Sequence, residues 1–437
     1  MHGALSDVRV VEFAQVVAIP VGGMLLAGLG AEVIKVEPPA GDSSRVIRPT
    51  GVEGQGRLFL VHNRGKRSIS IDLTHERARE VIEPLVASAD VVTTSFKQTD
   101  LPRYGLTYEQ LSAIKPDLVY LENTPYGPTG PMADMGGYDP VAMGLSGVAF
   151  QASSDVRGAP KLMVPAFADF GTGFLAALGV VAALRHRDRT GEGQKVETSL
   201  LATAMVFTSQ SNNWIDGLDD ARVERLTSEL ADAQADGAPF SEQQEIWWRS
   251  FRPDNTGNVS FRYYRCHDGF ISVGCLSPGL AKRFRTTMDI TDPRLDGGWD
   301  ADAPDAAEQV LAWVTEIEER FAARTCGEWL EFLRGHGLPC GPVNTAEQAL
   351  DDPQVAANGY VTEAEQPGVG RMRSYAPPLK LSASPVDPLG AAPTLGADGE
   401  DILHEIGLDD ETIVGLAHDG VLFHSSITPD EARLPPR

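Results

Sequence analysis

Short apolar runs alternate with longer amphipathic segments over the first 125 residues of the chain. Runs rich in β-branched residues predict strands, whereas runs with an apolar residue every three to four positions predict helices. The expected strands span residues 8–13, 32–36, 68–73, 90–96 and 117–122, and the expected helices span residues 20–29, 75–88 and 108–114. Strands that alternate with helices are typical of parallel sheets, so we expect an α/β fold with a Rossmann-like sheet.

The pattern changes after about residue 205, where Gln, Asn, Asp and Ser become frequent. A shorter α+β pattern then begins with two strand-like runs on either side of Asp268 and Gly269, and beyond residue 340 the chain becomes rich in proline and glycine. A tail of this kind needs an existing domain to pack on. We therefore expect a large Rossmann-like domain, a helical linker or insertion, a small α+β domain and a return segment on the large domain, spanning residues 1–205, 206–255, 256–340 and 341–437.

One carboxylate stands among small and apolar residues between positions 160 and 199. Asp169 comes just before Gly171 and Gly173, and an apolar run of helical length follows from residue 174 to 184. The pattern predicts a strand or loop that leads into a buried helix. Asp169 is then either an N-cap of that helix or an ionised nucleophile in a dry site, with the glycines leaving room for a ligand. The residues alone leave both interpretations open.

The formal net charge of −24 disfavours nucleic acid and anionic membranes as partners, because both need a basic surface. The longest apolar runs are interrupted by Asp169, by glycines or by Pro20, which argues against a membrane span. The first dozen residues include acidic side chains, unlike a signal peptide. The four cysteines form no CxxC pair, so we expect free thiols and a cytoplasmic location.

Cationic residues concentrate in one part of this acidic chain. They are Arg64, Lys66 and Arg67, with Lys35, Arg45 and Arg48 as further contributors. The cluster is either an anion site, suited to a polyanionic ligand such as a phosphorylated cofactor, or an ordinary scatter of surface charge.

Several enzyme classes lack their signatures here. The first turn, residues 17–23, has no GxGxxG in register, which excludes nicotinamide and flavin enzymes. Residues 144–147 fall one residue short of a GxSxG elbow, and no HExxH or close set of His and Cys occurs. We therefore expect neither a serine hydrolase nor a metal site, and no tightly bound cofactor.

Seven segments, in order, resemble the class III CoA-transferases of the CaiB/BaiF type, the group that contains formyl-CoA:oxalate and carnitine CoA-transferases. The segments are residues 29–42, 63–73, 126–131, 137–147, 168–173, 186–197 and 337–355. The resemblance implies transfer of CoA from an acyl-CoA to a carboxylic acid, with coenzyme A thioesters as substrates. It also implies an interlocked homodimer of ring-like subunits, with the site between the large domain of one subunit and the small domain of the other.

The resemblance also assigns roles to individual positions. The family nucleophile falls on Asp169. The family's CoA-contacting positions fall on Val17, Ala18, Pro38, Ile71, Asp72, Leu73, Thr74, Ser95, Phe96, Arg103, Gly137, Tyr138 and Asp139.

The chain departs from the family pattern at several of these places. Ile19 replaces a glycine, Pro38 stands where formyl-CoA transferase has an arginine, and Ser95 and Lys97 change a common Asn-Phe-x-Pro-Gly loop. Residues 252–262 occupy roughly the place of the glycine-rich loop that covers the intermediate in formyl-CoA transferase. Small dicarboxylates such as oxalate are therefore not the expected substrates.

The chemistry expected of Asp169 needs no general base, because an unperturbed aspartate with a pKa of about 3.9 is already ionised at neutral pH. Two alternatives remain. An α-methylacyl-CoA racemase would need a His where this chain has Tyr138, and a phenol is a poor base at neutral pH. A non-catalytic CoA-binding paralogue would not need to keep Asp169. We therefore favour the transferase.

Overall fold

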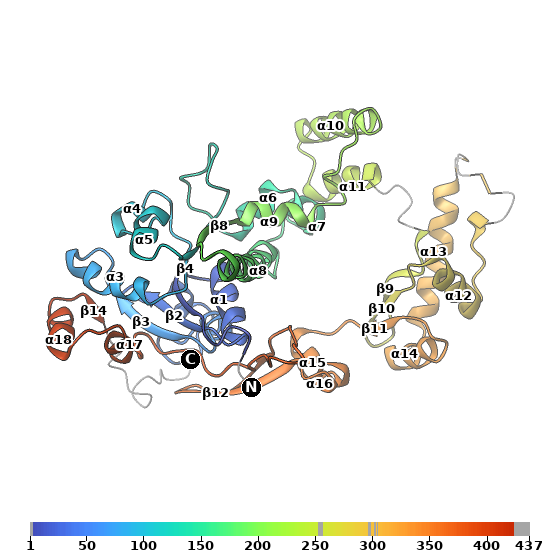
Figure 1. Ribbon diagram of the computed structural model, residues 1–437. Helices are drawn as coiled ribbons and strands as arrows, with labels where there is room; N and C mark the ends of the chain where they lie inside the picture. The colour runs from blue at the N-terminus through green and yellow to red at the C-terminus, as the bar shows by residue number, and fades with distance from the viewer. Residues whose placement is uncertain (1–2, 252–256, 296–298, 301–302, 304, 424–437) are drawn as a thin grey trace. The chain divides into compact units, whose positions relative to one another are not determined.

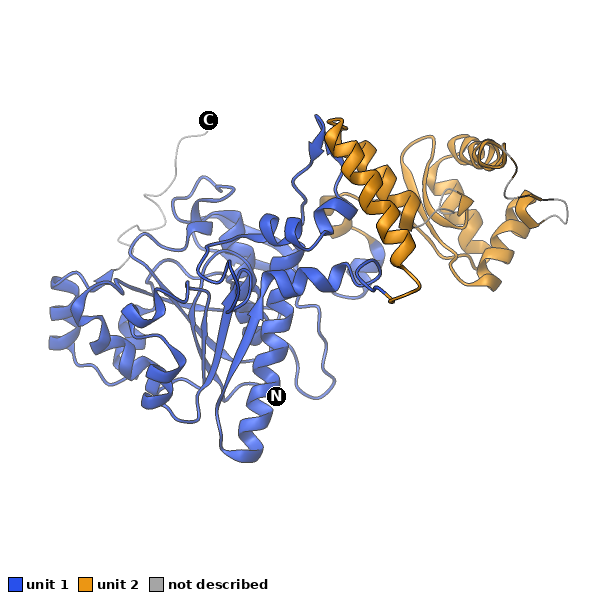
Figure 2. Cartoon of the chain, turned by 90° about the horizontal axis from the view of Figure 1, so that it is seen from above, with its two compact units in different colours: residues 1–214, 353–437 blue, residues 215–352 orange. Residues whose placement is uncertain are grey.

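The computed structural model describes residues 3–251, 257–295, 299–300, 303 and 305–423. Contacts within the chain divide it into two compact units, residues 1–214 with 353–437, and residues 215–352 (Figure 2). The expected boundaries were 205, 255 and 340, whereas the units separate at 214 and 352. Most of the expected helical linker, from residue 215 on, groups with the residues that follow it.

A seven-stranded sheet lies at the centre of the first unit, in the order β14-β3-β2-β1-β4-β5-β8 (Figure 1). All neighbouring strands are parallel except β14, which pairs antiparallel with β3. The strands are β1 (Arg9–Phe13), β2 (Glu32–Glu37), β3 (Arg67–Ile71), β4 (Val91–Thr94), β5 (Val119–Thr124), β8 (Gln194–Ser199) and β14 (Leu422–Phe423). The expected α/β class with a parallel-dominated sheet is confirmed.

Helices and two small hairpins complete this unit. The longer or better defined helices are α1 (Ala18–Gly28), α2 (Arg57–His62), α3 (Arg79–Ala87), α5 (Tyr108–Ile114), α6 (Asp139–Leu145), α8 (Phe167–Thr190), α9 (Leu200–Phe207), α17 (Gly399–Glu405) and α18 (Asp410–His418). Shorter elements are α4 (Leu101–Tyr104), α7 (Val148–Ala152), α16 (Pro353–Ala357), the hairpin of β6 (Asp155–Val156) and β7 (Ala159–Pro160), and the hairpin of β12 (Val361–Gln366) and β13 (Gly370–Tyr375).

The two faces of the sheet are covered by different helices, because successive side chains of a strand point to opposite faces. Val10 of β1 belongs to a core shared with α1 and α8. Its neighbour Val11 belongs to a core shared with α3, α5, α17 and α18. Both faces are therefore buried, as is usual for parallel strands.

Helix α8 begins earlier than expected. A strand or loop was expected up to Gly173, but one continuous helix runs from Phe167 to Thr190 and includes both glycines. A Cβ on Gly171 would lie 2.6 Å from Cγ2 of Thr203, and one on Gly173 would lie 2.7 Å from the carbonyl oxygen of Ala18. The glycines thus let α8 pack against α9 and α1. The interpretation that they make room for a ligand is wrong.

Helix α8 was also expected to be buried, and only one side of it is. Ala176 and Val180 lie in the core, whereas Phe174 and Leu178 are 51% and 65% exposed. By length and composition α8 is the one helix within the described ranges that could cross a membrane, a test that core helices of soluble proteins also pass. The helix has one core side and one exposed apolar side.

The second unit contains a three-stranded antiparallel sheet, in the order β11-β10-β9. Its core includes Tyr264, whose ring stacks on that of Phe321 with centroids 3.8 Å apart. The elements are α10 (Asp220–Ala235), α11 (Phe240–Phe251), β9 (Phe261–Arg265), β10 (Phe270–Gly274), α12 (Pro278–Met288), α13 (Ala306–Ala322), α14 (Cys326–Gly335), β11 (Cys340–Pro342) and α15 (Ala346–Leu350).

We predict that Gly173→Ala destabilises the protein by about 1–3 kcal/mol, because the added methyl group overpacks the contact between α1 and α8. The matched control is Gly144→Ala in α6, where a Cβ has no neighbour within 4 Å. That control should be neutral or stabilising by up to about 1 kcal/mol, since alanine favours helices over glycine. Thermal unfolding followed by circular dichroism measures both. Equal melting temperatures for the two variants would contradict the predicted contact.

Candidate functional site

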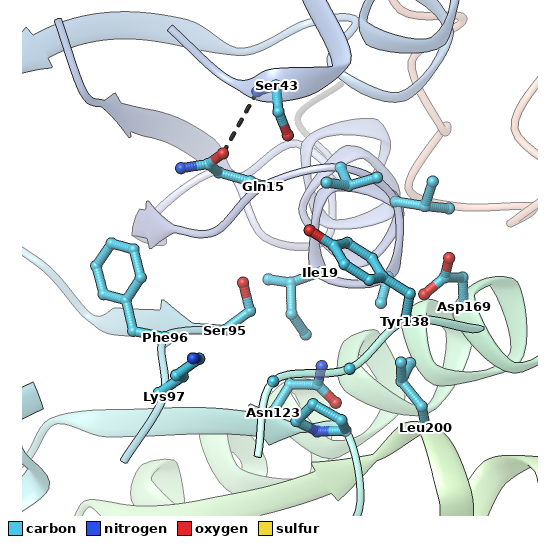
Figure 3. Close-up of a pocket in the computed structure, with 16 residues that line it drawn as sticks. Gln15, Ile19, Ser43, Ser95, Phe96, Lys97, Asn123, Tyr138, Asp169 and Leu200 are labelled. Atoms are coloured by element: carbon cyan, nitrogen blue, oxygen red, sulfur yellow. Dashed lines mark hydrogen bonds between the residues drawn. The ribbon is translucent and has the colours of Figure 1, made fainter. Parts of the chain in front are cut away.

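A cavity lies where the strand order of the sheet reverses, beyond the carboxyl ends of β1 and β4. Open α/β sheets bind their ligands at such a switch point. The cavity has a volume of about 590 Å³ (Figure 3). It is lined by Gln15, Val16, Val17, Ala18, Ile19, Ser43, Ser95, Phe96, Lys97, Asn123, Pro125, Gly136, Gly137, Tyr138, Asp169 and Leu200.

About half of the residues singled out in the sequence line this cavity. They are Asp169, Val17, Ala18, Ser95, Phe96, Gly137 and Tyr138. The structure therefore brings the candidate nucleophile together with residues from the turns after β1 and β4 and from the segment before α6.

The other candidates lie outside this lining. Ile71 is fully buried in the sheet, and Arg103 is exposed with its guanidinium 5.7 Å from the ring centroid of Tyr104. The side chain of Asp72 accepts hydrogen bonds from the amide and hydroxyl groups of Thr74. The whole set outside the lining is Pro38, Ile71, Asp72, Leu73, Thr74, Arg103 and Asp139. Their contact with CoA stays a prediction.

Sequence reasoning missed several lining residues, among them Gln15, Val16, Ser43, Asn123 and Leu200. Gln15 and Val16 follow β1, and Asn123 lies at the end of β5. A signal was available for these three, because the carboxyl ends of adjacent parallel strands meet at one edge of the sheet. Leu200 directly follows β8, which lies parallel beside β5, so the same rule applies to it, whereas Ser43 carried no comparable signal.

Asp169 is the third residue of α8 and does not cap it. The N-cap position is Ala166, which makes no side-chain capping bond. The capping carboxylate comes from α6: Oδ2 of Asp139 accepts hydrogen bonds from the amides of Ala168 and Asp169, at 2.9 and 3.3 Å. The N-cap interpretation of Asp169 is therefore wrong, and its side chain lines the cavity.

Burial raises the pKa of Asp169 to about 7, and the negative charge of Asp139 adds to the rise. Burial also raises the pKa of Asp139, although the amides of Asp169 and Ala168 oppose that rise. The expectation of an unperturbed aspartate was wrong, because the carboxylate lies in a partly dry site beside a second carboxylate. Near neutral pH the protonated and ionised forms of Asp169 therefore coexist.

The turn after β1 forms one wall of the cavity and has an unusual backbone. Val16 has a φ of 72°, a left-handed conformation that costs a β-branched residue on the order of 1–3 kcal/mol. Its amide donates to both carboxylate oxygens of Asp42, at 3.2 Å each. The amide of Ser43 donates to Oε1 of Gln15 at 3.3 Å (Figure 3). Nζ of Lys35 donates to the carbonyl of Ala14 at 2.7 Å. Side chains from the neighbouring segment hold this turn.

Asp42 belongs to a buried ionic cluster formed by Glu12, Lys35, Asp42 and Lys66. Nζ of Lys35 lies 2.9 Å from Asp42 and 3.3 Å from Glu12, and Nζ of Lys66 lies 2.8 Å from Glu12. Burial opposes the ionisation of Asp42, but the charge and hydrogen bond of Lys35 and the bonds from Ser44 lower its pKa to about 2. Burial lowers the pKa of Lys66 to about 8 against the opposing effect of Glu12. The cluster has two positive and two negative side chains.

Of the two interpretations of the cationic cluster, the anion site is not supported by the described residues, because most of these cations pair with other groups of the folded chain. Arg45 makes a two-pronged ion pair with Glu37, with both contacts at 2.7 Å. Arg64 is buried and donates to the carbonyl of Tyr375 at 2.9 Å. Arg67 pairs with Glu32 and Glu405. These three arginines, like Lys35 and Lys66, are therefore unavailable to a polyanion. Among the described residues of the cationic cluster, Arg48 alone is exposed and without an ion pair.

Within the described ranges, no group of three or more His, Cys, Asp or Glu side chains is arranged to hold a metal ion. The segment expected in place of the family's glycine-rich loop, residues 252–262, lies partly outside the described residues, which exclude 252–256.

Comparison with known proteins gives consistent matches over nearly the whole chain. The succinyl-CoA:glutarate CoA-transferase of Homo sapiens is 29% identical over 423 residues, covering 96% of this chain and 90% of that protein. The succinyl-CoA:mesaconate CoA-transferase of Haloarcula hispanica is 30% identical, covering 93% of this chain and 97% of that protein. The formyl-CoA:oxalate CoA-transferase of Rhodopseudomonas palustris is 29% identical, covering 97% of this chain and 98% of that protein.

A solved structure of similar fold is that of a CaiB/BaiF family protein from Brucella suis. It is 30% identical with a TM-score of 0.71, covering 93% of this chain and 100% of that one. The family described as CoA-transferase family III matches residues 5–399. These matches confirm the enzyme class expected from the sequence, and the chain belongs to CoA-transferase family III.

Proposed function

We propose that this enzyme transfers CoA from an acyl-CoA to a carboxylic acid through covalent intermediates on Asp169. The observation that carries the proposal is that the Asp169 carboxylate lines the cavity at the switch point of the sheet. A carboxylate can attack a thioester directly, so the reaction needs no neighbouring base.

In the first half of the proposed reaction, a carboxylate oxygen of Asp169 attacks the thioester carbonyl of the donor. The carbon–sulfur bond breaks, which leaves a mixed anhydride on Asp169 and a free CoA thiolate. The thiolate then attacks the carbonyl carbon of the Asp169 side chain. The donor leaves as its carboxylate, and an aspartyl-CoA thioester remains.

The second half reverses these steps with another acid. The acceptor carboxylate attacks the aspartyl-CoA thioester and releases CoA thiolate, which gives a new anhydride. The thiolate attacks the acceptor carbonyl of that anhydride. The products are acceptor-CoA and the free Asp169 carboxylate, so the enzyme returns to its initial state.

Each tetrahedral step needs donors for the developing oxyanion. The amides of Ala168 and Asp169 already donate to Asp139, and the amide of Phe170 donates to the carbonyl of Ala166 at 3.0 Å. Val17 and Ala18, from the turn after β1, line the same cavity as Asp169. We therefore favour Val17 and Ala18 as the oxyanion donors.

We also propose a homodimer and a cytoplasmic location. Phe174 and Leu178 of α8 and Val206 of α9 are large apolar residues that are 51%, 65% and 61% exposed. An apolar surface of this kind is typical of a protein interface, and a second copy of the chain would cover it. All four cysteines are free thiols, which supports a reducing compartment.

Several relatives carry names that specify dicarboxylates, but the substrates of this enzyme are open. We propose to screen succinyl-CoA, acetyl-CoA and 2-methylacyl-CoA donors against a panel of mono- and dicarboxylic acids by mass spectrometry. Turnover of any pair supports the transferase proposal and identifies the pair for the assays below.

We predict that Asp169→Asn lowers the rate of CoA transfer by on the order of 10³-fold or more, because an amide is a poor nucleophile. Asp188→Asn, at an exposed site on the same helix, is the control and should leave the rate unchanged. Incubation of the wild type with acyl-CoA and hydroxylamine should label a peptide that contains Asp169. Near-normal transfer by Asp169→Asn would rule out the covalent mechanism.

We predict that kcat/KM for acyl-CoA falls about tenfold per pH unit below pH 7 and levels off above it, because only ionised Asp169 attacks and its pKa is raised to about 7. Asp139→Asn removes the neighbouring charge and should shift this profile to lower pH. The pH dependence of single-turnover CoA release measures both. A profile that stays level down to pH 5 is the contrary result.

We predict that a 2-methylacyl-CoA in deuterium oxide keeps its α-hydrogen while a carboxylate receives the CoA. A racemase would exchange that hydrogen, and Tyr138 stands where it would need a base. Mass spectrometry of the recovered thioester counts the deuterium. Rapid exchange without transfer would favour the racemase instead.

We predict that the enzyme sediments as a dimer even at nanomolar concentration, because interlocked subunits cannot part without unfolding. Phe174→Glu with Leu178→Glu places charge in the proposed interface and should reduce the yield of folded dimer. An active monomer in analytical ultracentrifugation would refute the interlocked arrangement.

A further inference from the structure

Part of the lining of the cavity that contains Asp169 comes from a strained turn. Val16, Val17 and Ala18 follow β1 directly, and Val16 holds a φ of 72°. A β-branched residue keeps this conformation only where its surroundings enforce it. The groups that enforce it here therefore decide where Val17 and Ala18 lie.

Asp42 is the main group that does so. Both of its carboxylate oxygens accept the Val16 amide, and the same carboxylate accepts the amide and hydroxyl of Ser44, at 2.8 and 2.7 Å. Its charge is balanced by Nζ of Lys35 at 2.9 Å. Lys35 also donates to the carbonyl of Ala14, so the two residues hold the turn from both ends.

The turn also packs closely against α8, the helix that carries Asp169. The carbonyl oxygen of Ala18 lies 2.7 Å from the place where Gly173 of α8 would carry a Cβ. Asp169 lies one helical turn before Gly173 on that helix. A movement of the turn would therefore change the distance between Ala18 and the Asp169 carboxylate.

We propose that Asp42, although it is outside the cavity lining, is a positioning residue for CoA transfer that fixes the place of Val16, Val17 and Ala18 in the cavity that Asp169 also lines. This inference rests on the proposed role of Asp169. It differs from that proposal because Asp42 contacts no substrate and acts through the backbone of Val16. A displacement of about 1 Å in such a turn is enough to lower a rate about 10²-fold.

The test is Asp42→Asn, assayed with the donor and acceptor pair of highest turnover in the screen above. We expect kcat to fall by about 10²-fold while the KM for acyl-CoA changes less than about threefold, because the loss concerns alignment and not ground-state binding. The apparent pKa near 7 in the pH profile should stay, since the burial of Asp169 and the charge of Asp139, which raise it, are both untouched. The matched control is Asp90→Asn, whose carboxylate likewise accepts a backbone amide, that of Arg9 at 2.8 Å, and pairs with a cation, Arg187. The control lies at the amino end of β1, away from the cavity, and should keep its kcat.

Rescue by glycine separates positioning from general stability. Glycine adopts positive φ without strain, so the turn needs less enforcement when residue 16 is glycine. The double variant Asp42→Asn with Val16→Gly should have a kcat about tenfold or more above that of Asp42→Asn alone. If Asp42→Asn instead lost activity because the charge of Lys35 is left unpaired and the fold is destabilised, Val16→Gly would not restore it.

Three results would overturn the inference. They are a folded Asp42→Asn with wild-type kcat, an equal loss in Asp90→Asn, and a double variant no faster than Asp42→Asn. If Asp42→Asn does not fold, Ser44→Ala is the second test, because it removes one hydrogen bond to Asp42 and keeps the charge of Asp42. The kcat of Ser44→Ala should fall about three- to tenfold, and an unchanged kcat overturns the inference. Wild-type transfer that depends on Asp169 keeps the proposed function in place under each of these results.

Discussion

A buried, charge-neutral cluster of Glu12, Lys35, Asp42 and Lys66 holds the framework of this enzyme together. Removing one partner from such a cluster leaves an unpaired charge in the interior and typically costs about 3–5 kcal/mol. The four side chains come from β1, from β2, from the loop after β2 and from the turn before β3. Since β1, β2 and the turn before β3 are separated by long stretches of chain, the charges of Glu12, Lys35 and Lys66 can be balanced only when the strands are in register.

The same cluster fixes helix α1. Nζ of Lys66 donates to the carbonyl of Pro20 at 2.9 Å, and a Cβ on Gly23 would lie 2.0 Å from a carboxylate oxygen of Glu12. On its other side α1 contacts α8, where Gly22 and Gly173 permit close approach. A helix held by ionic contacts on one side and by glycine contacts on the other has little freedom to move. The spacing between α1 and α8, which both contribute residues to the cavity, is thus set by contacts in the core.

The pattern of apolar and polar residues along the chain was enough to predict most helices and strands of the central sheet. Contacts between residues far apart in sequence explain the elements that the pattern did not predict. The run rich in valine from Val8 to Phe13 predicted a strand, and β1 occupies Arg9–Phe13, whereas its burial on both faces became clear only from the helices that pack on it. The start of α8 was missed because Gly171 and Gly173 disfavour a helix in isolation, whereas packing against α1 and α9 overrides that preference. The order of strands, once known, places the cavity by a general rule.

Electrostatic properties were the hardest to predict, because they depend on partners that sequence does not pair. Lys66 looked like a surface cation, but its partner Glu12 lies 54 positions away. The raised pKa of Asp169 depends on burial and on Asp139, which is 30 positions away. The family resemblance pointed to the nucleophile, but only the folded arrangement shows the environment that controls its charge.

The return of the chain to the first unit has a consequence for the order of synthesis. Helices α17 and α18 cover one face of the central sheet, with Ile402 and Leu416 in its core, and β14 completes the sheet edge beside β3. The ribosome makes the rest of that sheet by Trp214, yet it reaches α17 only roughly 185 residues later, about 10 to 40 s at typical elongation rates. During that interval α3 and α5 cover only part of this apolar face, and the edge of the sheet at β3 is free. Chaperones that bind such surfaces have their longest access to this protein then, while the second unit is being made.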